Sequence, residues 1–179
     1  MTAIAAGGLT LGVAGVVASV AGQAEAAKIQ TQKRRVALIG DSYAVGLGPE
    51  LAKLLPGLRS EGHVGTSSAE WANHGARCVN CGDWLTAYQP EITLVALGVN
   101  DGNAPNSANF HTIISALHGI GSKVVWIEPP AGVRAPVLRA VIGSLGVQVV
   151  PGANVPLAAD GIHPSSYKPW ARDIARAIS

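Results

Sequence analysis

From residue 36 onward, short apolar runs alternate with amphipathic segments, and this alternation limits the folds open to the chain. The apolar runs are 36–39, 92–97, 123–127 and 147–150, and the amphipathic segments that follow them are 47–55, 110–117, 137–145 and 170–178. The uninterrupted run 93–97 suits a strand buried on both faces. Residues 110–117 place apolar side chains at i, i+3, i+4 and i+7, as a helix covering a sheet does. The alternation predicts a three-layer α/β fold with a mainly parallel sheet.

The length of 179 residues suits a single folded domain. Hydrophobic residues make up 48% of the chain and charged residues 13%, and much of the apolar excess lies in the first 22 positions. We therefore divide the chain into an apolar segment (1–27), a polar linker (28–34) and a folded domain (35–179).

The uncharged stretch 3–21 is rich in Ala, Gly and Val, and as a helix it is just long enough to cross a bilayer. Three interpretations remain open: a cleaved export signal, a membrane anchor, or an apolar helix that packs into an assembly. Ala24-Glu25-Ala26 resembles a signal-peptidase site, but no Lys or Arg precedes the apolar run. The segment is also similar in composition to the start of small phage virion proteins that enter membranes. We expect an extracytoplasmic or membrane-associated protein, with a virion-associated one as the alternative.

Charge and cysteine content narrow the choice of partners. The formal net charge is +2, and the one basic cluster, at residues 33–35, has no interleaved aromatic residues, so we expect no nucleic-acid partner. Cys78 and Cys81 are too few for a four-ligand zinc site unless a histidine such as His74 contributes. A small disulfide, two inert thiols or a redox pair are the other interpretations. The remaining histidines have no metal-ligand spacing, and we expect neither a metal nor a cofactor.

Three short motifs carry candidate functional groups: two follow apolar runs, where such groups collect in parallel sheets, and the third leads into the last helical segment. They are Gly40-Asp41-Ser42-Tyr43, Gly98-Val99-Asn100-Asp101 and Asp160-Gly161-Ile162-His163. Ser42 would begin a helix, whose unpaired N–H groups favour developing negative charge. An Asp three residues before a His can accept from its imidazole and fix the tautomer. Asp41 and Asp101 are expected to cap or brace their loops.

Together with Gly65, placed after a less clear second strand near residues 63–67, these motifs resemble the SGNH (GDSL-like) hydrolase family in their order. The resemblance spans about residues 35–179 and implies a flavodoxin-like sheet of about five strands. It also implies a catalytic triad of Ser42, His163 and Asp160, with an oxyanion hole formed by the N–H groups of Ser42 and Gly65 and the side-chain amide of Asn100. Tyr43 stands where the Gly-Asp-Ser-Leu subgroup has Leu.

The resemblance implies a serine esterase that forms an acyl-enzyme. A carbohydrate or cell-envelope O-acetyl esterase is the leading interpretation, because the short chain leaves little room for a large lid. A lysophospholipase or thioesterase is the alternative within the family. Candidate contacts to a glycan or lipid carrier are Tyr43, Trp71, Arg77 and Trp84, although at least one tryptophan is expected in the core. Two further rivals are a binding module that keeps the fold without catalysis, and a membrane-inserting or virion component whose main function lies in residues 1–35.

Overall fold

The structure is a computed structural model of the whole chain and describes residues 34–74 and 83–179. Along the chain the elements are β1 (Val36–Gly40), α2 (Ser42–Ala52), β2 (Arg59–Gly62), α3 (Ser68–His74), α4 (Trp84–Tyr88), β3 (Ile92–Ala96), the 3₁₀ turn η1 (Val99–Asp101), α5 (Ser107–Gly119), β4 (Lys123–Ile127), α6 (Pro136–Ser144), β5 (Gln148–Val150) and α7 (Lys168–Ala177). The predicted 1–27 segment, nearly all of the 28–34 linker, and Arg77, Cys78 and Cys81 lie outside the described residues.

The five strands form one parallel sheet in the order β2-β1-β3-β4-β5. The predicted α/β fold with a five-stranded sheet is therefore confirmed, and all strand pairs are parallel. Gly40 at the end of β1 is level with Gly62 of β2 and with Ala96 of β3. This register brings the loops that follow the three strands to one edge of the sheet.

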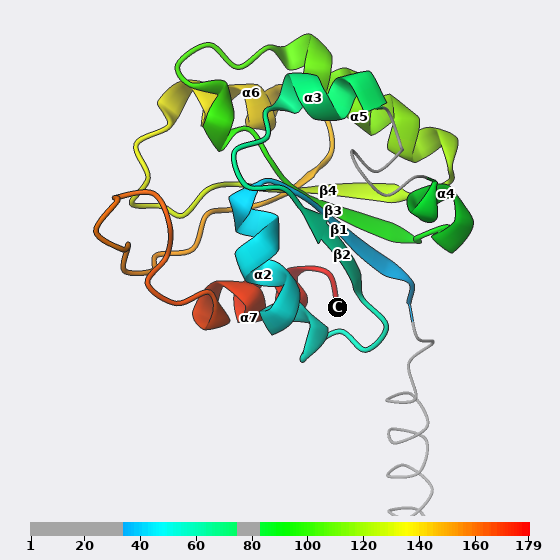
Figure 1. Cartoon of the computed structure of the whole chain (residues 1–179), viewed down its shortest axis with the longest axis horizontal. Helices are drawn as coiled ribbons and strands as arrows, with labels where there is room; N and C mark the ends of the chain where they lie inside the picture. The colour runs from blue at the N-terminus through cyan, green and yellow to red at the C-terminus, as the bar shows by residue number, and fades with distance from the viewer. Residues whose placement is uncertain (1–33, 75–82) are drawn as a thin grey trace, which may run out of the picture. The chain divides into compact units, whose positions relative to one another are not determined.

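Helices cover both faces of the sheet (Figure 1). On one face, α2 and α7 pack against alternate strand residues such as Leu38 and Leu94. On the other, α3, α5 and α6 pack against the intervening residues, such as Ile39 and Val95. Strand residues of both sets are buried, which explains why the apolar runs in the sequence are continuous.

The second strand lies earlier in the chain than predicted. β2 comprises Arg59-Ser60-Glu61-Gly62, and Gly65 lies in the turn that follows rather than at a strand end. Because β2 is at the sheet edge and is partly exposed, its residues are polar and give no apolar signal.

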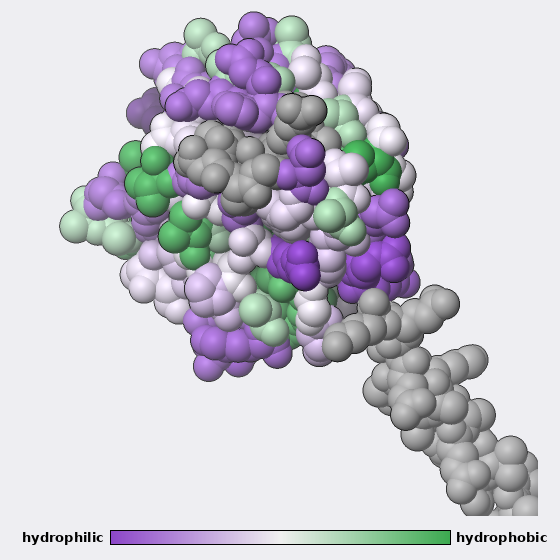
Figure 2. Space-filling model, turned by 45° about the vertical axis from the view of Figure 1, so that its right-hand side comes forward, coloured by the Kyte–Doolittle hydropathy of each residue, from purple (hydrophilic) through white to green (hydrophobic). Residues whose placement is uncertain are grey.

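On the face shown in Figure 2, hydrophobic residues form small patches between polar ones. In the described part of the chain, no helix combines the length and apolar character needed to span a membrane.

Candidate active site

Ser42 is the first residue of α2, directly after β1. The chain turns sharply here because Gly40 lies against β3, where a Cβ atom would be 1.9 Å from the Ala96 carbonyl oxygen. The N–H of Asp41 donates to that same oxygen (3.0 Å). Asp41 also caps α2, since its Oδ1 accepts from the N–H of Tyr43 (2.9 Å). The predicted capping role of Asp41 is confirmed.

The loop before α7 brings His163 and Asp160 to Ser42, 121 positions earlier in the sequence. His163 Nε2 lies 2.8 Å from Ser42 Oγ, and His163 Nδ1 lies 2.7 Å from Asp160 Oδ2. In Figure 1 this loop, in orange, stands on the same side of the molecule as the start of α2. A hydroxyl, an imidazole and a carboxylate thus form one hydrogen-bonded row.

The loop holds Asp160 in its ionised form. Asp160 Oδ1 accepts from the N–H groups of Ile162 (2.8 Å) and His163 (2.9 Å). The hydrogen bond from the His163 ring, followed by these two N–H groups, lowers the pKa of Asp160 to about 2. An ionised carboxylate only accepts, so Nδ1 of His163 carries the proton when the ring is neutral. Nε2 is then free to accept from the Ser42 hydroxyl.

Tyr43 joins the Ser42 helix to the His163 loop. Its ring is buried, and its hydroxyl donates to the carbonyl oxygen of Ile162 (3.0 Å). The ring meets His163 edge-on at 5.8 Å between centroids and meets Trp170 in the same manner at 5.2 Å. Tyr43 therefore packs against the imidazole. Its buried ring offers almost no surface to a substrate, so the structure does not support the carrier contact that the sequence suggested.

Asn100 lies in η1, after β3, and its side-chain N–H donates to the carbonyl oxygen of Thr66 (2.9 Å). Beside it, Asp101 Oδ1 accepts from the N–H of Ser68 (2.8 Å), the bracing role predicted for this carboxylate. These two bonds tie the loop after β3 to the loop after β2, which contains Gly65. Gly65 has a φ of +82°, and no atom lies within 4 Å of the position of a Cβ.

The other predicted carrier contacts are dispersed. Trp71 is fully buried, and its indole N–H donates to the Thr66 hydroxyl (3.3 Å), so it belongs to the core and does not support a substrate contact. Trp84 is half-buried and donates to the Glu61 carboxylate on the edge strand. The core also contains Trp126 and Trp170, as expected for at least one tryptophan.

A cavity of about 350 Å³ opens beside the site. It is lined from the loop after β3, from residues 133–138 and from Gly161 and Ile162. Sequence reasoning missed the 133–138 segment because it carries no recognisable motif. This segment contributes one cationic side chain to the cavity lining, the exposed Arg134.

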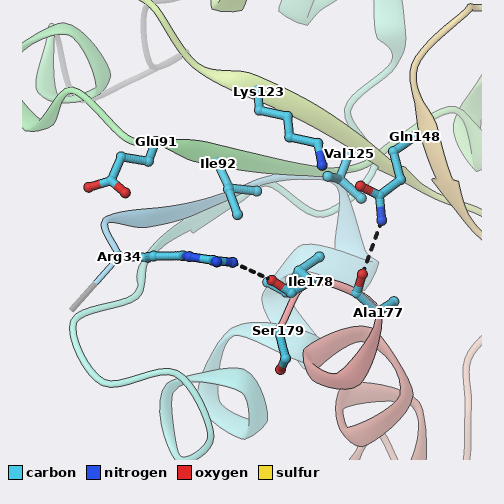
Figure 3. Close-up of a pocket in the computed structure, with 9 residues that line it drawn as sticks. All are labelled: Arg34, Glu91, Ile92, Lys123, Val125, Gln148, Ala177, Ile178 and Ser179. Carbon is cyan, nitrogen blue, oxygen red and sulfur yellow. Dashed lines mark hydrogen bonds between the residues drawn. The ribbon is translucent and has the colours of Figure 1, made fainter. Parts of the chain in front are cut away.

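A second cavity, of about 420 Å³, lies at the amino ends of β3, β4 and β5 (Figure 3). Its walls are tied to the C-terminal residues by hydrogen bonds from Arg34 to the Ile178 carbonyl and from Gln148 to the Ala177 carbonyl. Parallel sheets bind ligands at the carboxyl ends of their strands. The cavity of about 350 Å³, which follows β3, is at that end and is therefore the candidate for substrate binding. Within residues 34–74 and 83–179, no group of three His, Cys, Asp or Glu side chains could hold a metal ion.

No protein-family profile matches the chain, and no curated protein matches it in sequence. Solved structures do match in fold, among them the following two. The C-terminal catalytic domain of peptidoglycan O-acetyltransferase A from Streptococcus pneumoniae, which carries a methylsulfonyl adduct, has 18% identity and a TM-score of 0.57 over 81% of this chain and 90% of that chain. A two-domain esterase active on acetylated mannans has 14% identity and a TM-score of 0.52 over 90% of this chain and 51% of that chain. Both are SGNH hydrolases, and at these identities the likeness shows the fold.

Proposed function

Starting from the SGNH hydrolase fold, we propose that this protein is a serine esterase that cleaves carboxylic esters through an acyl-enzyme. The observation that carries the proposal is the row from Ser42 Oγ to His163 Nε2 and from His163 Nδ1 to Asp160, with distances of 2.8 and 2.7 Å. A lone pair on a neutral imidazole, aimed at a serine hydroxyl, is the arrangement that activates a serine nucleophile.

In the first half-reaction, Ser42 Oγ attacks the ester carbonyl carbon while its proton passes to His163 Nε2. The ester C–O bond then breaks, His163 gives this proton to the departing alcohol, and the acyl group remains on Ser42. Water repeats the sequence: it loses a proton to His163, attacks the acyl carbon, and the acid leaves as Ser42 regains its proton. Asp160 stays ionised and stabilises the imidazolium.

Negative charge on the carbonyl oxygen would be stabilised by three donors: the N–H groups of Ser42 and Gly65 and the side-chain amide of Asn100. The N–H of Ser42 lies at the start of a helix, where the dipole favours an anion. One N–H of the Asn100 amide is held by Thr66, which fixes the plane of the amide and leaves its second N–H for the oxyanion.

We favour an O-acetyl group on a glycan as the substrate. One of the similar structures comes from an acetyl-transferring enzyme of peptidoglycan and the other from an esterase of acetylated mannans. A longer acyl chain, as in a lysophospholipid or thioester, is the second candidate. It is favoured by exposed aliphatic side chains on the segments that carry the site, among them Val64, which is 75% exposed, and Ile162, which is 40% exposed.

The test is hydrolysis of 4-nitrophenyl acetate by the wild type and by Ser42→Ala. We expect the variant to lose about 10⁴- to 10⁶-fold in turnover, as deletion of a triad serine does. A fluorophosphonate probe should label the wild type on Ser42 and leave the variant unlabelled. A binding module that has kept only the fold would show neither activity nor labelling, and unchanged activity in Ser42→Ala would refute the assignment.

A further inference from the structure

The cavity beside the site shares its walls with the reacting groups. Gly161 and Ile162 line it and directly precede His163, while Val99 lines it and directly precedes Asn100. The opposite wall is the turn into α6, residues 133–138, held in place by Arg139. The Arg139 guanidinium donates to the carbonyl oxygen of Val133 in this wall (3.4 Å), to Glu128 (3.0 Å) and to the carbonyl oxygens of Pro129 and Pro130 (3.0 and 2.7 Å). These bonds fix the wall before any ligand arrives.

Arg134 is the one charged side chain among the residues that line this cavity. In the described part of the chain it makes no hydrogen bond or ion pair, in contrast to Arg139. The start of α6 lies on the same wall, and its N-cap, Ala135, supplies no side-chain acceptor. The wall therefore adds positive potential to a cavity whose other lining residues are apolar or glycine, apart from Asn103.

The carboxylates near Ser42 add negative potential, which opposes the positive potential of the 133–138 wall. Asp160 is ionised, and Asp101 stands behind Asn100 with one oxygen on the Ser68 N–H. Without Arg134, these carboxylates would repel an anionic ester from the reacting groups. A cation without an ion-pair partner at this position therefore has a selective consequence: it adds an attractive interaction for substrates that place a negative group in the cavity.

The direction of the reaction indicates which part of the ester reaches Arg134. His163 must protonate the departing alcohol oxygen, so the alcohol lies on the His163 side of the carbonyl. Gly161 and Ile162, the two residues before His163, line the cavity, so an alcohol that leaves next to His163 can extend into it. A volume of about 350 Å³ also exceeds what an acetyl group needs, whereas it accommodates a ring-sized alcohol.

We infer that this cavity binds the alcohol portion of the substrate, and that this portion carries an anionic group, a carboxylate or a phosphate, which pairs with Arg134. The inference rests on the proposed esterase function and specifies its substrate class as acyl esters of anionic alcohols. Arg134 then acts as a specificity residue that touches the substrate and takes no part in bond cleavage.

The experiment compares three acetyl esters with matched alcohols: 4-acetoxybenzoate and 4-acetoxyphenyl phosphate, which are anionic, and methyl 4-acetoxybenzoate, which is neutral. Each kcat/KM is divided by the rate constant of spontaneous hydrolysis, so that intrinsic reactivity cancels. We expect the wild type to prefer at least one anionic ester by about tenfold, the size of a charge-assisted contact. The larger preference identifies carboxylate or phosphate as the bound group.

Arg134→Gln should lose this preference, and Arg134→Lys should regain part of it. Arg172→Gln is the matched control, because it removes the same charge from an exposed position on α7 that does not line the cavity. Equal rates on all three esters in the wild type, or a preference that survives in Arg134→Gln, would overturn the inference and leave the esterase proposal intact. Absence of both hydrolysis and fluorophosphonate labelling in the wild type would instead overturn the proposed function.

Discussion

Tyr43 follows Ser42 in sequence, yet its hydroxyl donates to Ile162, the residue before His163. A single side chain thus connects the segment with the proposed nucleophile to the segment with the proposed base. The sequence could not separate this role from a substrate contact, because both place an aromatic residue beside a reactive serine. Burial of the ring and the direction of the hydroxyl decide between them.

We predict that Tyr43→Phe lowers kcat about three- to tenfold with little change in KM. The ring continues to pack against Trp170, but the His163 loop loses one tether, and a small misplacement of the base lowers the rate. Tyr88→Phe is the matched control, since the Tyr88 hydroxyl also donates to a backbone carbonyl, that of Gly57, on an exposed part of the domain. Steady-state kinetics on 4-nitrophenyl acetate would contradict the positioning role if both variants kept the wild-type kcat.

Asp41 is the buried carboxyl behind Ser42, and its Oδ2 has no hydrogen-bond partner. Burial raises the pKa of Asp41 to about 7 from its ordinary value of 3.8, against the opposing effect of the Tyr43 N–H, and Asp101 raises the pKa further. The charge of His163 acts to lower it. The folded state therefore holds this proton over a range of pH in which the unfolded chain has released it.

The sign of the pH dependence follows from linkage. Between about pH 4 and 7 the unfolded chain binds fewer protons at Asp41 than the folded chain, so the free energy of unfolding falls as pH rises. We predict a loss of about 2–4 kcal/mol across this window in the wild type and a much shallower slope in Asp41→Asn. Urea unfolding between pH 5 and 8 measures both slopes, and Asp160, ionised in the folded chain and nearly so in the unfolded chain over that range, adds little slope of its own. Parallel slopes in the two proteins would show that Asp41 titrates normally.

At the scale of elements, apolar spacing in the sequence predicted the strands and helices that are buried and missed the segments that are exposed. β3 and α5 were found because Leu94 and Val95 are buried on opposite faces and Phe110 to Leu117 carry a helical stripe. β2 was misplaced because an edge strand satisfies one side of its backbone with β1 and leaves polar side chains exposed. The turn into α6 was missed for a similar reason: its shape comes from Arg139 bonding to backbone carbonyls, which no local pattern encodes.

We predict that Gly40→Ala severely destabilises the domain, by more than about 3 kcal/mol. The new Cβ would meet the Ala96 backbone at 1.9 Å, and the φ of +154° also disfavours a side chain, so β1 and β3 would have to separate. Gly143→Ala, in α6 with open space around its Cβ position, should instead be neutral or slightly stabilising. Thermal unfolding of the two variants makes the comparison, and equal stability would mean that the β1–β3 contact tolerates the methyl group.

At the scale of the whole domain, the strand order places the site. β1 lies between β2 and β3, so the sequence order reverses at β1, and the loops after these strands meet at one edge. Motif order therefore predicted that Ser42, Asn100 and His163 would lie on neighbouring loops. It could not predict the cavity or the exposure of Arg134, because both depend on how the 133–138 segment packs against the His163 loop.

The last prediction concerns the division of the chain near residue 34. The hydrogen bonds described for the site join residues of the 35–179 domain, from the Ser42 helix to the His163 loop and from Asn100 to Thr66. We predict that a chain starting at Arg34, which keeps the Arg34 bond to Ile178, hydrolyses 4-nitrophenyl acetate with a kcat/KM within about twofold of the full chain.

The apolar 3–21 stretch should direct the full chain into the detergent phase of a Triton X-114 partition and leave the shortened chain in water. A tenfold loss of activity on shortening would mean that the first 33 residues contribute to catalysis, and equal partitioning would argue against a membrane or assembly role for them.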